Sequence, residues 1–226
     1  GFSSCTELST IEIPINSKLR VIEESAFAGS FIESLTIPSS LIDLKEGWCV
    51  GTPFLTDIRI SPNNPRYSLV DNKVVVGKSS IESNIYDIVV FGVRNIRTIK
   101  IPSFIKIIAS FAFDRCAELY NVEIPENSEL QTINEYSFSS SSIERFSIPS
   151  HLKYLKEGAF SDSNKLRKLD IPENSELQTI ESVAFSETLI ESLRIPSKVT
   201  YIGEQIFFDC HIFRIIEIHE NSKLKY

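Results

Sequence analysis

Apolar residues recur along this chain as short runs that end in the dipeptide Ile-Pro. Before most of these dipeptides stands the pattern L/I-x-x-L-x-I, in which the last two apolar residues alternate with polar ones. Alternation at a period of two is typical of a short β-strand with one buried face. Because proline has no amide hydrogen to donate to a sheet, we expect each strand to end at the Ile-Pro, where the chain turns away.

The even spacing of these strands indicates an internal repeat. Successive isoleucines of the pattern lie 24 or 23 residues apart, apart from one interval of 41, so the true unit is a pair of 47 residues. Halfway through each unit a small residue precedes an aromatic one, as at Ala159-Phe160 and Ala184-Phe185. We expect the small residue to let neighbouring turns approach and the ring to fill the interior.

A unit with a single strand cannot bury its apolar face alone, whereas stacked units share one continuous core. The sequence therefore predicts a solenoid whose short parallel strands stack into one sheet, with loops and short helical turns on the convex side. We expect residues 1–226 to form a single array of about nine turns, with units of alternating length.

The repeat resembles a known family. The pattern L-x-x-L-x-I-P, followed in the longer units by Asn at 16, 127, 174 and 221, resembles the leucine-rich repeat. The fuller pattern I-P-S-x-L-x-x-L-x-E-G-A-F-x-x-S-x-x-L-x-x-L-x-I-P is similar to the BspA-like subfamily of surface proteins from anaerobic bacteria and parasitic protists, over almost the whole chain. The resemblance implies a leucine-rich repeat solenoid at the cell surface or outside the cell, with a role in adhesion or protein-protein contact.

The interval of 41 residues, between Ile60 and Ile101, predicts a β-hairpin insertion over about residues 61–95 that protrudes from the solenoid. Residues 74–76 and 88–91 are its β-prone runs, and Asp71-Asn72 is the expected turn into it. A role as a brace on the adjacent coil and a role in binding fit equally well. In the second case, Tyr67 and Tyr86 would form an insertion surface for a ligand.

Charge and composition narrow the classes of partner. The 226 residues are 42% hydrophobic and 23% charged and carry a formal net charge of −7. This balance argues against nucleic acid and anionic membranes, which attract clustered Lys and Arg. No apolar run approaches the roughly 20 residues of a membrane-spanning helix. Since the chain has no Met and begins with Gly1-Phe2, we expect a fragment of a longer protein, monomeric or weakly associated end to end.

Candidate chemistry is sparse. Cys5, Cys116 and Cys210 fall in equivalent loops roughly 19 Å apart, whereas a disulfide needs Cα atoms within about 7 Å. Cys49 takes the place of the repeat's Phe, so it should be interior. We therefore expect all four cysteines to be structural thiols, small and buried, and not disulfides. The three His residues have no metal-binding spacing, and the glycines are too scattered for a phosphate loop. The sequence thus predicts no catalytic residue, metal or cofactor.

The candidate binding site consists of the variable residues between the buried ones of each strand, on the face that we expect to be concave. These residues change from turn to turn while the buried positions hardly do, which fits both a recognition surface and an unconstrained solvated face. The candidates are Asp57, Arg59, Lys100, Glu123, Arg145, Lys168, Asp170 and Arg194.

Two hypotheses follow for the function. In the first, the chain is a non-enzymatic module that binds a protein, such as a host extracellular-matrix or cell-surface protein. Arg145, Lys168 and Arg194, on neighbouring turns, would then accept an acidic segment of the partner. In the second, the chain is a structural spacer or coat array without a ligand of its own.

Overall fold

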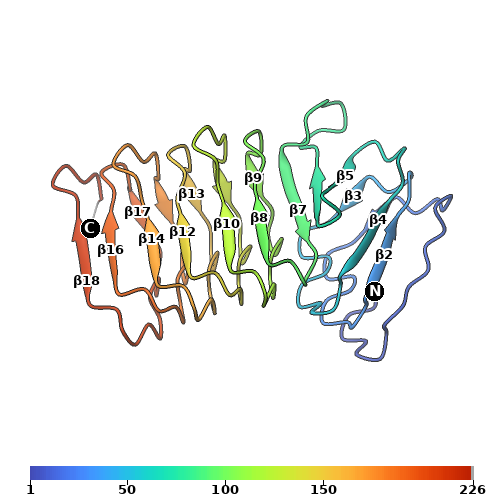
Figure 1. The fold of residues 1–226 in the computed structure, drawn as a ribbon, viewed down its shortest axis with the longest axis horizontal. Coiled ribbons are helices and arrows are strands. Elements are labelled where there is room, and N and C mark those ends of the chain that lie inside the picture. The colour runs from blue at the N-terminus through green and yellow to red at the C-terminus, as the bar shows by residue number, and fades with distance from the viewer. Residues whose placement is uncertain (225–226) are drawn as a thin grey trace.

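The computed structural model describes residues 1–224, which form a solenoid of short β-strands without any helix (Figure 1). The short helical turns predicted for the convex side are therefore wrong for these residues, because the bends are tight turns instead. Strands with the predicted L-x-x-L-x-I pattern are β2 (Ser34–Ile37), β4 (Asp57–Ile60), β8 (Thr98–Lys100), β10 (Asn121–Glu123), β12 (Arg145–Ser147), β14 (Lys168–Asp170), β16 (Ser192–Ile195) and β18 (Ile215–Ile218).

Most coils also contain a second, shorter strand after the Ile-Pro. These two-residue strands are β1 (Val21–Ile22), β3 (Asp43–Leu44), β9 (Ile107–Ile108), β11 (Thr132–Ile133), β13 (Tyr154–Leu155), β15 (Thr179–Ile180) and β17 (Tyr201–Ile202). Sequence reasoning did not predict them, since two residues are too few to show a period.

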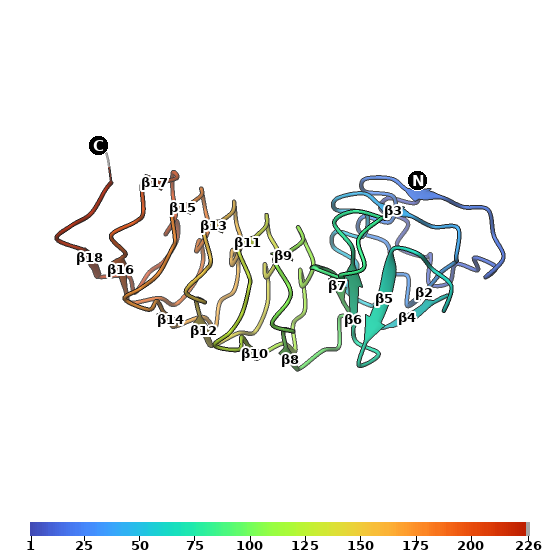
Figure 2. The same cartoon turned by 90° about the horizontal axis from the view of Figure 1, so that it is seen from above.

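The two sets of strands lie on opposite sides of a bent array (Figure 2). The short strands from β9 to β17 join one continuous sheet on the inner side of the bend, which we call the inner sheet. The L-x-x-L-x-I strands, here the outer strands, lie on the outer side and pair only two by two. Coils are closest on the inner side of a bend, so the ladder continues there. The prediction that the variable residues face a concave surface is therefore wrong.

A column of stacked rings fills the regular coils. Phe113, Phe138, Phe160 and Phe185 are buried, and their successive ring centroids lie 5.1, 5.2 and 6.0 Å apart. Backbone hydrogen bonds join the turns at the same level, for example from Phe138 N–H to the Ala159 carbonyl at 2.9 Å. The small-aromatic pairs of the repeat thus occupy the interior, as predicted.

The insertion is a three-stranded meander built into the inner sheet. Its strands are β5 (Tyr67–Val70), β6 (Val74–Gly77) and β7 (Ile88–Gly92); β6 is antiparallel to both neighbours, and β7 is parallel to β9. Asp71 and Asn72 have positive φ angles of 50° and 53°, as the predicted turn requires. The predicted hairpin of residues 74–76 and 88–91 is confirmed as β6 and β7, with β5 as a third strand. It does not protrude as predicted, because β7 takes the place of a regular inner strand.

All four cysteines are free thiols. Cys49 and Cys116 are buried, as predicted, and Cys210 is partly buried. The prediction is wrong for Cys5, which is exposed at its position in the first described coil.

Candidate binding surfaces

The predicted site residues line the outer strands, where they alternate with buried neighbours such as Ile58, Val122 and Phe146. Several of them pair with one another across adjacent strands or along one strand. Their N–O distances are 3.0 Å for Arg59–Asp57, 2.7 Å for Lys100–Glu123, 3.2 Å for Arg145–Asp170 and 2.7 Å for Lys168–Asp170. Such exposed pairs each add little stability, so the side chains are free to exchange partners.

The outer strands carry a local excess of positive charge at one point, the outer cluster of Arg145, Lys168, Asp170 and Arg194. Hydrogen bonds from Lys168 and then Arg145 lower the pKa of the Asp170 carboxyl. Arg194 forms no ion pair with any residue in the part of the chain that the structure describes. Asp170 and Arg194 border a shallow depression of about 410 Å³. Even with Glu217 opposite Arg194 in the strand register, three cations against two carboxylates favour a negatively charged ligand here.

The two tyrosines predicted for an insertion surface have different environments. Tyr67 is buried, and its hydroxyl oxygen accepts a hydrogen bond from Leu44 N–H at 2.8 Å. Burial raises the pKa of Tyr67, while that hydrogen bond and the nearby Arg66 oppose the shift. Tyr67 thus braces the meander against β3, which corrects its assignment to an exposed surface. Tyr86 is half-buried, with the Lys78 ammonium 5.2 Å from its ring centroid.

The inner sheet exposes a row of side chains that sequence reasoning missed. The strand register aligns Ile88, Ile107, Thr132, Tyr154, Thr179 and Tyr201 across six neighbouring strands. In this row Tyr154 is 38% and Tyr201 is 52% exposed, whereas the next residue of each strand points toward the core. A signal was present, since the two tyrosines occupy the same position in two copies of the 47-residue unit.

An ion pair lies beside this row of inner-sheet side chains, which we call the tyrosine row after Tyr154 and Tyr201. Lys156 Nζ is 2.6 Å from Glu181 Oε1 and 6.0 Å from the centroid of the Tyr154 ring. The hydrogen bond to Glu181 raises the pKa of Lys156, so this ammonium is charged at neutral pH. The inner sheet thus combines exposed aromatic rings with a fixed pair of charges.

Within residues 1–224 no three His, Cys, Asp or Glu side chains are grouped so that they could hold a metal ion. The same residues include no helix long and apolar enough to cross a membrane.

Solved structures with the same fold come from bacteria. A leucine rich cell surface protein from Faecalibacterium prausnitzii A2-165 is 25% identical, with a TM-score of 0.81 and coverage of 98% of this chain and 58% of that chain. The pneumococcal vaccine antigen PcpA shares the fold at 23% identity and a TM-score of 0.67, over 97% of this chain and 47% of that chain. A leucine-rich repeat protein from Eubacterium ventriosum does so at 16% identity and a TM-score of 0.64, over 88% and 52%. This chain thus spans about half the length of these proteins.

No curated protein sequence matches the chain. A family model does: six copies of the "BspA type Leucine rich repeat region" match residues 1–69 and 80–214, on both sides of the first part of the meander. These matches cover most of the chain and agree with the coils seen in the structure, so the chain belongs to the BspA-type leucine-rich repeat family.

Proposed function

We propose that this chain is a non-enzymatic module of a cell-surface protein and that it binds a protein ligand through its inner sheet. The observation that carries the proposal is the exposed pair Tyr154 and Tyr201 on the inner side of the bend. The proposed location outside the cell rests on the family and on its similarity to a leucine rich cell surface protein.

Tyrosine is among the residues that dominate binding energy at protein interfaces, because its ring buries a large apolar area with little loss of conformational entropy. Tyr154 and Tyr201 lie two strands apart, which places them roughly 10 Å from each other. Thr179 stands between them in the row. Two rings at this spacing can grip an extended segment or a helix of the partner, as the concave faces of other repeat proteins do.

The outer cluster is the second candidate surface, for an acidic segment of a host matrix or cell-surface protein. Its support is the excess of Arg145, Lys168 and Arg194 over Asp170 and Glu217. Asp57, Arg59, Lys100 and Glu123 extend this face along the outer strands, where they are paired with each other. A face of mutually paired charges is also what a structural spacer would present to solvent.

The test is binding of the 226-residue chain to a panel of purified extracellular-matrix and cell-surface proteins, measured by biolayer interferometry. The double variant Tyr154→Ser/Tyr201→Ser removes the rings of the inner sheet. Tyr120→Ser is its matched control, because Tyr120 is 54% exposed and lies just before outer strand β10. The triple variant Arg145→Glu/Lys168→Glu/Arg194→Glu reverses the outer cluster.

We expect the double variant to weaken binding by at least about 30-fold, from two anchors worth roughly 1 kcal/mol or more each. The Tyr120→Ser control should bind like the wild type. Loss of binding only in the charge-reversed variant would move the site to the outer cluster. Absence of binding to every member of the panel would favour the spacer.

A further inference from the structure

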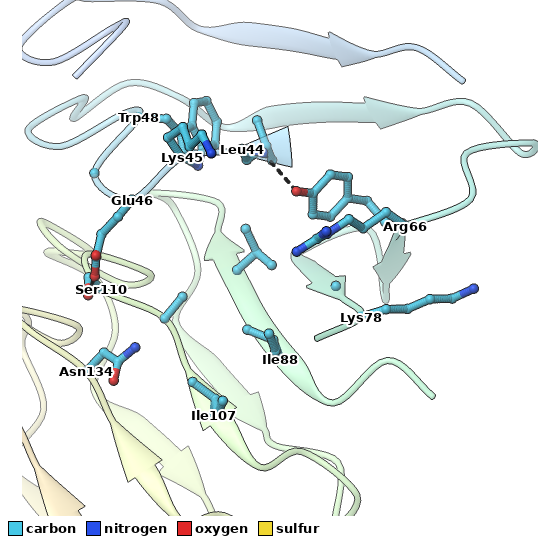
Figure 3. Close-up of a pocket in the computed structure, with 15 residues that line it drawn as sticks. Leu44, Lys45, Glu46, Trp48, Arg66, Lys78, Ile88, Ile107, Ser110 and Asn134 are labelled. Atoms are coloured by element: carbon cyan, nitrogen blue, oxygen red, sulfur yellow. Dashed lines mark hydrogen bonds between the residues drawn. The ribbon is translucent and has the colours of Figure 1, made fainter. Parts of the chain in front are cut away.

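The tyrosine row ends at a pocket where the inner strands are interrupted (Figure 3). Among the described strands, β3 pairs with β1 alone, and the next inner strand, β7, pairs with β6 and β9. A gap of about 260 Å³ therefore remains between the open edge of β3 and the meander. The Tyr67 hydroxyl oxygen accepts the hydrogen bond that Leu44 N–H would otherwise give to a following strand.

The pocket has an apolar floor. It is lined by Leu44, Trp48, Ile88, Val90, Ile107 and Ala109. Gly77 keeps this region open, since a Cβ atom there would lie 2.8 Å from Val90 Cγ2 and 3.2 Å from the Tyr67 ring. Small-molecule sites commonly combine such an apolar lining with one or two polar groups.

Arg66 is the polar group at the pocket with an unpaired donor, although its guanidinium also lies beside the Tyr67 hydroxyl. Its Nε is buried and has no hydrogen-bond partner among the described residues. Figure 3 shows its side chain reaching over the apolar floor, while the Lys78 side chain extends away from it. Lys45, also at the pocket, is paired with Asp43 at 2.7 Å.

The opposite wall carries acidic side chains that already have a hydrogen-bond partner. Glu46 accepts a hydrogen bond from the Ser110 hydroxyl, which is also within 2.6 Å of Glu135 Oε2. Within residues 1–224 the pocket therefore offers a guanidinium with an unpaired Nε at one end and a hydrogen-bonded carboxylate at the other. A singly charged anion fits this arrangement, whereas a dianion such as a phosphate monoester would be repelled by Glu46.

We propose that this pocket binds a small monocarboxylate with an apolar body. The carboxylate accepts hydrogen bonds from the Arg66 guanidinium, whose planar donors match its two oxygens. The apolar body covers Ile88, Val90 and Ile107. The site is separate from the proposed protein-binding rings, so either proposal can fail without the other.

The first experiment titrates the 226-residue chain with hexanoate and phenylacetate, followed by saturation-transfer NMR. Hexanamide and phenylacetamide are the matched neutral compounds. We expect saturable binding of both acids, and at least about tenfold weaker binding of the amides, because a charge-assisted hydrogen bond is lost. Acids that do not bind, or acids and amides that bind equally, would overturn the proposal.

Variants locate the binding. Arg66→Gln should weaken the acids by about tenfold or more and leave the amides unchanged. Lys73→Gln is the control, since Lys73 lies in the exposed turn before β6. Ala109→Leu should block acids and amides alike by filling the floor; equivalent positions in later coils carry Asn134, Lys156 and Glu181, so a larger side chain is accommodated there.

Circular dichroism and thermal melting establish that each variant is folded. If Arg66→Gln does not fold, two measurements still test the proposal. These are the difference in binding between the acids and the amides, and the loss of binding in Ala109→Leu. Unchanged acid binding in folded Arg66→Gln or Ala109→Leu contradicts the proposal. A peptide with a free C-terminal Phe is the last arm; its binding without that of the free acids would reassign the pocket to protein C termini and overturn the proposal as stated.

Discussion

Regular coils and the junction with the meander fill their interiors in different ways. In the regular coils, Phe113, Phe138, Phe160 and Phe185 stack in one column. At the junction the column is interrupted, because Cys49 stands where the repeat has Phe. The space is filled instead by the neighbouring Trp48, whose ring centroid lies 5.5 Å from that of Phe91, and from the meander side by Phe91 and the buried side chain of Arg94.

Arg94 does at the junction what stacked rings do elsewhere, and it also satisfies polar groups. Its Nε donates to the Thr52 carbonyl at 3.2 Å and one terminal nitrogen to the Ala112 carbonyl at 3.3 Å. The guanidinium carbon lies 4.4 Å from the centroid of the Phe91 ring. Coils that stack in register pair their backbone groups with one another, so apolar side chains are enough to fill them. Where the register breaks, a carbonyl such as that of Thr52 requires a donor from a side chain.

The largest effect is expected inside the regular column. Phe138→Ala removes a ring that contacts both Phe113 and Phe160, so it should lower the free energy of unfolding by about 3–5 kcal/mol. Urea denaturation at pH 7 measures the change. Phe104→Ala is the control, because Phe104 is 44% exposed and should cost far less. Equal losses for the two variants would contradict the assignment of the column as the main core.

At the junction, Arg94→Met keeps most of the side-chain volume and removes the guanidinium donors. The Thr52 carbonyl then loses its donor, whereas the Ala112 carbonyl keeps the Gly92 N–H at 2.8 Å. The free energy of unfolding should therefore fall by about 1–3 kcal/mol. The opposing expectation is a small loss, because replacing a buried charge by an apolar group of similar volume can be neutral. A variant as stable as the wild type would mean that Arg94 fills space and does not satisfy these carbonyls.

Thiol labelling separates a local effect from a global one. Burial raises the pKa of the Cys49 thiol to about 12, and Arg94 offsets only part of this shift. Native Cys49 and Cys116 should therefore react slowly at pH 8, and exposed Cys5 quickly. Loss of Arg94 removes an interaction that favours the thiolate, so by itself it should slow the labelling of Cys49 and Cys116 further. Faster labelling of these two thiols in Arg94→Met, with Cys5 unchanged by mass spectrometry, would therefore report local opening of the junction.

A smaller effect is expected where the two regions meet. Gly92 ends β7, and a Cβ atom there would lie 2.4 Å from Cε1 of Phe113. Gly92→Ala should thus displace the first ring of the column and cost about 1–2 kcal/mol through overpacking. Thermal melting measures the loss. The double variant Gly92→Ala/Phe113→Leu should recover part of it, and no recovery would place the strain elsewhere.

Much of this architecture is visible in the sequence, because its signals repeat. The spacing of Ile-Pro and of the small-aromatic pairs predicts the outer strands and the ring column. Strands such as Thr132–Ile133 are too short to show a period. The direction of the bend depends on how the distance between coils differs between the inner sheet and the outer strands. Arg94 reads as a loop residue, and only the meander's placement buries it. The inner row was missed because it depends on these short strands and on the bend.

The smallest effect concerns the surface of the regular coils, at the pair Lys156–Glu181. Its partly exposed side chains limit the contribution to about 0.5 kcal/mol. The folded protein raises the pKa of Lys156, so this stabilisation is present at neutral pH, starts to decline above about pH 10.4, and is lost as pH rises through the folded pKa. Lys156→Met should therefore be slightly less stable than the wild type in urea at pH 7 and 9, with the difference shrinking at pH 11. Lys165→Met, at an exposed position without an ion pair among the described residues, should show no such trend. A difference for Lys156→Met that stays constant up to pH 11 would assign the effect to packing of the lysine stem on Tyr154 and not to charge.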